Sequence, residues 1–379
     1  MPQKPGSGDA RAGHDEKTGR SCPEIGLVSA GMAALTFAQQ ARGSSMKPFR
    51  LMMAAGFAAV LSLSAAGAEE LHIAGVVSGG VESAWDRAFM ESVKRVAASK
   101  PYGLDVTFDF TENVQYDQAE QVYRTYAESG KYDIIFGDGG YADAVEQVMG
   151  DYPDTLFVVS GSGNKPLGKN GYLVYLHLHE PAYLLGLLAG SMSKSKVVGV
   201  IGTFPADDAN DQINAFFRGA KSVDPAIKGK VTFIQSWYDP PKSTAATVAQ
   251  AAAGADFIYQ LAPAFEGCVQ KKIGCFGNFA DMSDSAPEVI VTSSTAEWDP
   301  LVKYVIDQWK AKKDTGKPYD APLEPVWFGM ATGGLDIAPY HAWDDKVPAD
   351  VKKKVADARA AILDGSLKVP LETGEPKSD

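Results

Sequence analysis

The feature that most constrains the fold is a regular alternation of short β-rich runs with longer helical patterns, which begins at Leu71. The β-rich runs of the first series are 71–77, 106–110, 133–136, 155–159 and 172–178, and helical patterns at 84–98, 115–129 and 141–149 separate the first four. In the pattern at 84–98, the apolar residues follow a helical period and predict one buried face. Such alternation is typical of βαβ units and predicts an α/β fold with a mostly parallel sheet.

A second series of the same kind follows the helical pattern at 181–192. Its expected strands are 197–201, 231–235, 257–260 and 289–292, and its expected helices are 208–222, 242–253 and 264–271. Both series open with a β-rich run that enters a glycine-containing loop and then a helix. Because 379 residues suffice for two domains, we expect two similar α/β lobes in tandem. Helices near 298–313 and 348–363 and the segment 326–337 are expected to complete the lobes.

The start of the chain predicts export. Residues 46–50 are a short basic start, 51–65 are apolar, and Ala66-Gly67-Ala68 forms an A-x-A cleavage site, so 46–68 is interpreted as a signal peptide. The apolar run is shorter than the roughly 20 residues of a spanning helix, and no cysteine lies near the cleavage site. We expect a periplasmic protein without a lipid anchor, and we interpret residues 1–45 as an upstream extension outside the fold.

The charge excludes two classes of partner. The chain carries 36 basic and 47 acidic side chains, for a net charge of −11, and removal of residues 1–68 makes it −14. A surface this acidic does not bind nucleic acid or an anionic membrane through bulk charge.

Two cysteines remain in the exported chain, Cys268 and Cys275. In an oxidising compartment they can pair across a short loop. Their spacing is equally compatible with two buried free thiols, because disulfide geometry cannot be read from spacing. Neither alternative indicates catalysis or metal binding.

Four segments carry a resemblance to a known family. They are VVSGGVESAWD at 76–86, EPAYLLG at 180–186, FFRGA at 216–220 and GADFIYQ at 254–260. In these segments the chain resembles the basic membrane protein family of ABC-transporter substrate-binding proteins, which includes purine-nucleoside receptors. Trp85 and Asp86 stand where that family usually has Phe and Asn.

The resemblance implies a type I periplasmic-binding-protein fold, with two doubly wound, Rossmann-like lobes, a ligand cleft between them and three crossovers that connect them. The N-terminal lobe is then expected to contain 69–179 plus about 295–325, and the C-terminal lobe 180–294 plus about 326–370. The implied function is an ABC-importer substrate-binding protein that closes its lobes around a purine base or nucleoside and then meets an inner-membrane permease. We expect a monomer that needs no metal or organic cofactor.

Candidate ligand-binding residues should follow strands, because ligands of open parallel sheets bind at the carboxyl ends of the strands. Trp85, in the first turn of a helix, can stack on a planar ring or can simply belong to the apolar helix face. Asp86 can accept hydrogen bonds from a ligand, or can complete a capping box with Ser83. Asp138 and Tyr141 follow the run 133–136 in the segment GDGGY, which also has the composition of a plain turn.

In the second series, Phe204, Tyr259 and Phe265 lie at or just after strand ends. One of them is a candidate for the opposite face of an aromatic sandwich, and core packing is the alternative for each. Asp281 falls where the family usually keeps an acidic residue that binds sugar hydroxyls, a role that suits a carboxylate.

Motifs of catalysis and metal binding are missing from the sequence. The segment 161–170 resembles a P-loop but has six residues between its glycines and no Ser or Thr after its lysine. His177 and His179 share a strand face without further ligands at a suitable spacing, so no metal site is expected. We therefore expect no enzyme activity. The alternatives are an exported enzyme such as a nucleoside hydrolase, and a sensory receptor with the same binding fold.

Overall fold

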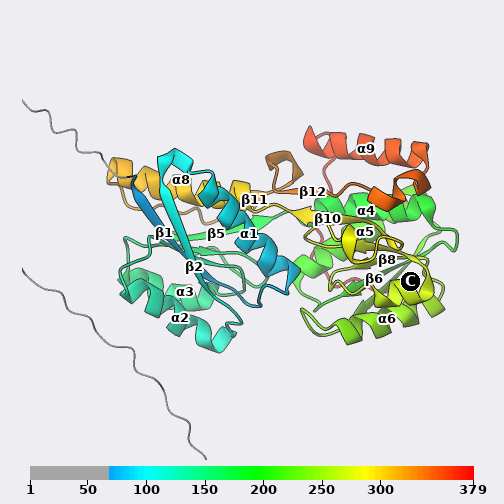
Figure 1. Ribbon diagram of the computed structural model, residues 1–379, viewed down its shortest axis with the longest axis horizontal. Helices are drawn as coiled ribbons and strands as arrows, with labels where there is room; N and C mark the ends of the chain where they lie inside the picture. The colour runs from blue at the N-terminus through cyan, green and yellow to red at the C-terminus, as the bar shows by residue number, and fades with distance from the viewer. Residues whose placement is uncertain (1–67) are drawn as a thin grey trace, which may run out of the picture. The chain divides into compact units, whose positions relative to one another are not determined.

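The computed structural model describes residues 68–379, which are coloured by residue number in Figure 1. The predicted upstream extension 1–45 and all but the last residue of the predicted signal peptide lie outside the described residues. Among the residues that are described, no helix is long and apolar enough to cross a membrane.

The first sheet has six parallel strands in the order β11-β5-β4-β3-β1-β2. The strands are β1 (Glu70–Val76), β2 (Asp105–Thr111), β3 (Ile134–Gly137), β4 (Leu156–Val159), β5 (Gly171–Leu176) and β11 (Val326–Phe328). The central strands β3, β4 and β5 are buried along their whole length, which explains their continuous apolar sequences. The strand order reverses direction between β1 and β3, as in a doubly wound sheet.

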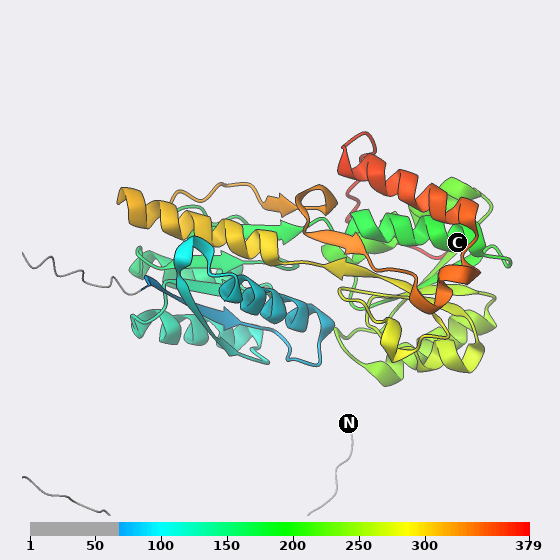
Figure 2. The same ribbon diagram turned by 45° about the horizontal axis from the view of Figure 1, so that its top comes forward.

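Helices cover the first sheet. They are α1 (Ala84–Ala98), α2 (Tyr116–Glu128), α3 (Ala142–Val148) and α8 (Asp299–Thr315). The hydroxyl of Ser83 caps α1 by accepting a hydrogen bond from the backbone N–H of Asp86. Helix α8 comes from far along the chain and packs beside α1, as Figure 2 shows.

The second sheet repeats this plan with the order β12-β10-β9-β8-β6-β7, and only β12 is antiparallel. Its strands are β6 (Val197–Gly202), β7 (Lys228–Phe233), β8 (Phe257–Gln260), β9 (Gly274–Gly277), β10 (Ile290–Ala296) and β12 (Leu335–Ile337). The sequence did not predict β9, because two of its four residues are glycines, which are weak strand formers. The α/β prediction with two doubly wound lobes is confirmed.

The helices of the second sheet are α4 (His179–Met192), α5 (Asp207–Val223), α6 (Pro240–Ala252), α7 (Glu266–Lys271) and α9 (Ala349–Leu363). Helix α4 is apolar on almost all sides because it lies between α5 and α9. A side chain at Gly186 would meet the backbone oxygen of Phe216 at 1.9 Å, and one at Gly219 would meet that of Tyr183 at 2.1 Å. These glycines let α4 and α5 pack closely, and this contact fixes the position of α5.

Three connections join the two sheets: β5 to α4, β10 to α8, and β11 to β12. The predicted boundary near residue 326 needs a correction, since β11 was assigned to the C-terminal lobe but pairs with β5 of the first sheet. Strand β11 has only three residues, and a short turn separates it from β12, which pairs in the other sheet. The sequence pattern therefore does not show that β11 and β12 belong to different sheets.

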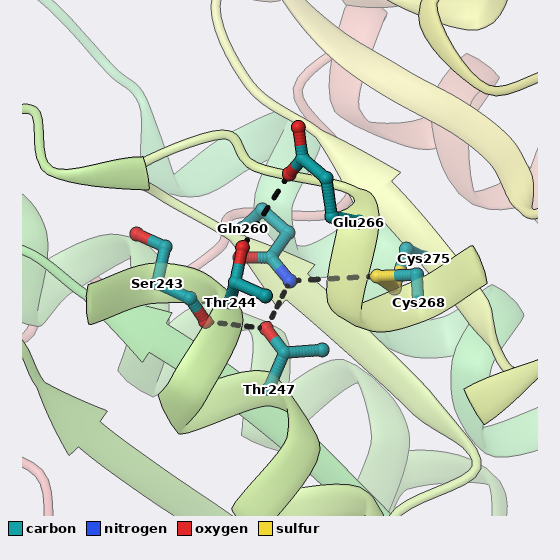
Figure 3. Close-up of a disulfide and its surroundings, with 7 residues drawn as sticks. All are labelled: Ser243, Thr244, Thr247, Gln260, Glu266, Cys268 and Cys275. Carbon is teal, nitrogen blue, oxygen red and sulfur yellow. Dashed lines mark hydrogen bonds between the residues drawn. A yellow bond between two sulfur atoms is a disulfide. The ribbon is translucent and has the colours of Figure 1, made fainter. Parts of the chain in front are cut away.

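Cys268 and Cys275 form a disulfide, which settles the alternative left open by their spacing. It links α7 to β9, and Figure 3 shows the polar side chains around it. The amide of Gln260, at the end of β8, donates to the hydroxyl of Thr247 at 2.7 Å and to the sulfur of Cys268 at 3.5 Å. The disulfide therefore stabilises the part of the second sheet from which residues 261–263 emerge.

Candidate ligand-binding site

A cavity lies where the carboxyl ends of the two sheets face each other. Its empty space is about 790 Å³, open solvent included. The lining residues follow β1, β3 and β4 of the first sheet and β6, β7, β8 and β9 of the second, or begin α1, α2 and α5. The cavity thus lies at the point where the strand order reverses in each sheet, the usual ligand position in doubly wound folds.

Trp85 stands at the centre of the first-sheet wall. Its indole nitrogen donates to the backbone oxygen of Asp138 at 3.0 Å. Its ring makes edge contacts with Phe279 and Trp298, at centroid distances of 5.1 and 4.7 Å. Trp298 is fully buried and Phe279 lines the cavity from the second sheet. These contacts hold the indole of Trp85 in one orientation at the cavity, where α1 begins.

Asp86 and Asp138 supply two buried carboxyl groups to the same wall, each on a residue that is 2% exposed. Oδ1 of Asp86 accepts from the backbone N–H of Gly79 at 3.0 Å. Oδ1 of Asp138 accepts from the backbone N–H of Ser78, the residue before Gly79, at 3.2 Å. Burial and the neighbouring Asp86 raise the pKa of Asp138 well above its ordinary value.

Only one of the two hydrogen bonds of the predicted capping box between Ser83 and Asp86 is present. Ser83 caps the Asp86 amide, but the backbone N–H of Ser83 donates to the oxygen of Gly80 instead of to the Asp86 carboxyl. That carboxyl occupies the space beside Gly79, where an added side chain would meet Oδ2 at 2.6 Å. Asp86 is thus directed to the glycine-rich loop at the cavity.

The second-sheet wall carries polar groups on the first turns of α5. Oδ2 of Asp208 accepts from the hydroxyl of Tyr175 at 2.7 Å, and burial raises the pKa of the Asp208 carboxyl. One turn further, Gln212 lines the cavity and its Oε1 accepts from the hydroxyl of Tyr259 at 3.1 Å. Both polar side chains are therefore positioned by buried tyrosines.

Several aromatic side chains that line the cavity have large exposed areas. Trp237 is 47% and Tyr238 is 48% exposed in the loop after β7, and Tyr116 is 61% exposed at the start of α2. Phe204 contacts Trp237 at a centroid distance of 5.1 Å. We refer to Tyr116, Trp237 and Tyr238 as the aromatic rim.

Of the residues predicted from the sequence, Trp85, Asp86 and Asp138 are brought together on the cavity wall. Tyr141 is not among the lining residues, because it is buried and its hydroxyl donates to the backbone oxygen of Val114 at 2.9 Å. Phe204 lies beside the wall, where it supports Trp237.

The remaining predicted residues also lie off the wall. Tyr259 is fully buried behind Gln212, and Phe265 packs into the core cluster that contains the disulfide. Oδ1 of Asp281 accepts from the backbone N–H of Ser283 at 3.1 Å, and its Oδ2 lies 2.7 Å from Nε2 of His341. The predicted positions after strands are correct, but these side chains leave the strand ends in other directions.

The sequence reasoning missed several lining residues: Tyr116, Asp208, Gln212, Trp237, Tyr238 and Phe279. The same rule that found Asp86 was available for Asp208, which begins the first helix of the second series. Phe279 follows β9, so the missed strand hid it. Trp237 was missed because the strand before it was predicted at 231–235, whereas β7 already ends at Phe233.

The lining contains three aspartates and no Lys, Arg or His side chain. Such a wall disfavours phosphate or carboxylate groups and suits ligands that offer N–H or O–H donors. In the described part of the chain, no three His, Cys, Asp or Glu side chains are grouped to hold a metal ion. Burial lowers the pKa of His179, one of the two histidines considered above, to about 4.

Comparison with known proteins agrees with this arrangement. The chain matches the family model of PnrA-like ABC transporter substrate-binding proteins (Bmp) over residues 72–365. It is 31% identical to a purine-binding protein of Brucella abortus (strain 2308) over 321 residues. The matched residues cover 83% of this chain and 88% of that protein. It is 28% identical over 270 residues to a putative ABC transporter glucose-binding protein of Haloferax volcanii, which covers 69% of this chain and 64% of that protein.

A solved structure shares the fold. An ABC transporter solute-binding protein from Aeropyrum pernix K1 superposes with a TM-score of 0.66 at 16% identity, over 80% of this chain and 94% of that chain. The described residues thus have the two-lobed type I fold of periplasmic solute-binding proteins. On the family model and the Brucella relative, the resemblance found in the sequence is confirmed, and the chain belongs to the PnrA-like family of ABC transporter substrate-binding proteins.

Proposed function

We propose that this protein binds a neutral purine in the cavity and delivers it to an ABC importer. One observation carries the proposal: an oriented indole and two buried carboxyls share a wall whose cavity has no basic lining residue. The aromatic face of Trp85 suits a planar ring, and the carboxyl groups suit its N–H donors. The name of the Brucella relative, a purine-binding protein, supports the same ligand class.

The position of Asp281 favours a free base over a nucleoside. This residue was expected to bind sugar hydroxyls, but it lies outside the lining, and its carboxyl is engaged by Ser283 and His341. The cavity wall therefore lacks the acidic side chain expected to bind a ribose. We infer that purine bases bind more tightly than the corresponding nucleosides.

Binding is expected to favour a closed arrangement of the lobes, because the cavity takes lining residues from both sheets. The ligand-bound form would then be recognised by a permease. The signal-like segment 46–68 supports export to the periplasm, and we propose that the protein acts there as a monomer. The subunit itself is expected to leave its ligand chemically unchanged.

Calorimetry on the chain from Glu69 onward tests this function. The ligands are adenine, guanine, hypoxanthine, their nucleosides, and glucose, which is included because of the Haloferax relative. We expect a purine base to bind and to raise the melting temperature, because a ligand that binds only the folded state stabilises it. Binding of glucose without any purine would overturn the proposal. Chromatography of the recovered ligand separates the receptor from the hydrolase alternative, which predicts a split nucleoside.

A further inference from the structure

The carboxyl groups of Asp86 and Asp138 lie side by side in the cavity wall. The consecutive amides of Ser78 and Gly79 each hold one of them, which places the two groups within reach of each other. Both residues are 2% exposed. Oδ2 of Asp138 is buried, and no hydrogen-bond partner reaches it among the described residues. A buried carboxyl oxygen without a donor is unfavourable unless it carries a proton that it can donate.

No cation that would neutralise the pair is found among the described residues around it. Arg87 follows Asp86 on α1, but its guanidinium donates to the backbone oxygen of Val81. The other ionisable groups nearby are acids: Tyr123 and Tyr116 on α2, Tyr141 after β3, and Asp208 across the cavity on α5. Two adjacent buried carboxylates without a counter-ion repel each other strongly, so one of them retains its proton.

We propose that Asp86 and Asp138 share one proton at neutral pH, so that the ligand meets a carboxyl–carboxylate pair with a single negative charge. Oδ2 of Asp138 then has a partner in the Asp86 carboxylate. The raised pKa of Asp138 agrees with this arrangement. The pair determines specificity, because it tolerates a neutral ligand with N–H donors and gives no advantage to an anion.

This inference rests on the proposed function only for the nature of the ligand, and its first test needs no ligand. The unfolded chain releases this proton above about pH 4, the ordinary pKa of Asp, while the folded protein keeps it. The folded state therefore binds more protons, and stability decreases as the pH rises from about 4 to the raised pKa of Asp138. Asp138→Asn has no such proton and is the matched control.

Chemical denaturation of wild type and Asp138→Asn, from about pH 4 upward, measures the effect. The unfolding constant of the wild type, relative to the variant, is expected to rise tenfold per pH unit within this window, because one proton is linked to folding. The infrared band of a protonated carboxyl is expected to be stronger in the wild type at pH 7 than in Asp138→Asn; burial also raises the pKa of Asp208 and Asp211, whose contribution is common to both proteins. A pH-independent ratio of unfolding constants together with equal bands in the two proteins would overturn the inference, even if a purine binds.

The ligand arm uses adenine, with calorimetry across alkaline pH. For a neutral ligand, the dissociation constant is expected to rise up to tenfold per pH unit once the shared proton is lost. In Asp138→Asn, the amide takes the place of the protonated carboxyl, so this rise should disappear, and Asp138→Ala should bind at least tenfold more weakly than Asp138→Asn. An affinity for adenine that increases with pH would overturn the neutral-ligand part, because a neutral ligand gains nothing when the shared proton is lost. If no purine binds at all, the proposed function is in error, and the ligand-free titration alone decides the shared proton.

Discussion

The two walls of the cavity are built differently, although the two sheets have the same strand order. On the first-sheet wall, Trp85, Asp86 and Asp138 are each held by a backbone group or by buried rings. On the second-sheet wall, the side chains of Trp237 and Tyr238 are about half exposed. The comparison indicates that the first wall is preorganised for the ligand, while the half-exposed rings of the second wall add contacts when the cavity closes.

The largest expected effect comes from Trp85→Ala. Loss of the stacking surface should weaken purine binding by about 100-fold, near the upper end of the roughly 1–3 kcal/mol measured for stacking of a base on an aromatic side chain. Calorimetry with adenine gives the value, and far-ultraviolet circular dichroism checks that the variant is folded. A loss of less than threefold in a folded variant would remove Trp85 from the site.

The second prediction concerns the disulfide that supports the second wall. Replacing Cys268 and Cys275 together by serine reopens an eight-residue loop and should lower the free energy of unfolding by about 2.5 kcal/mol on the loop-entropy model. Chemical denaturation of the variant and of the oxidised wild type measures the difference. Equal stabilities would show that the hydrogen bonds around Gln260 hold this region without the disulfide.

Trp237→Ala tests the second wall directly. Because its indole is already 47% exposed, removal should weaken binding by about 1 kcal/mol, or about fivefold. Phe204→Ala, which removes only the ring behind Trp237, serves as the matched control with a smaller effect. If Trp237→Ala weakens adenine binding more than Trp85→Ala does, the comparison of the two walls is reversed.

The smallest effect is expected for Asp281→Asn. The side chain lies outside the lining and contacts His341, so the affinity for adenine should change by less than about twofold, the range of a substitution away from the site. Calorimetry with adenine and adenosine compares base and nucleoside. A selective loss of adenosine binding would mean that Asp281 reaches a sugar when the lobes close.

The sequence predicted the α/β architecture and one wall of the site, and physical reasons limit the rest. Position after a strand identified Trp85, Asp86 and Asp138, because glycine-rich loops and helix starts mark the strand ends. The rule does not say which way a side chain turns: Tyr259 lies at the end of β8 but points behind Gln212. Phe265 also follows a strand, as the lining residues do, yet its ring packs into the core cluster that contains the disulfide.

The second wall was harder to predict because its loops are defined by short strands. Residues 274–277 form β9 through pairing with β8 and β10, and their own sequence is a poor strand. Without β9, Phe279 has no strand end to follow. The role of Trp237 depends on how far the loop after β7 extends over the cavity, which is a tertiary feature.

A crystal structure of the chain from Glu69 onward with adenine bound tests the central claim most directly. We predict the ring stacked against the indole of Trp85, with its N–H groups directed to the carboxyls of Asp86 and Asp138. Adenine bound only at the aromatic rim, away from both carboxyls, would contradict the account.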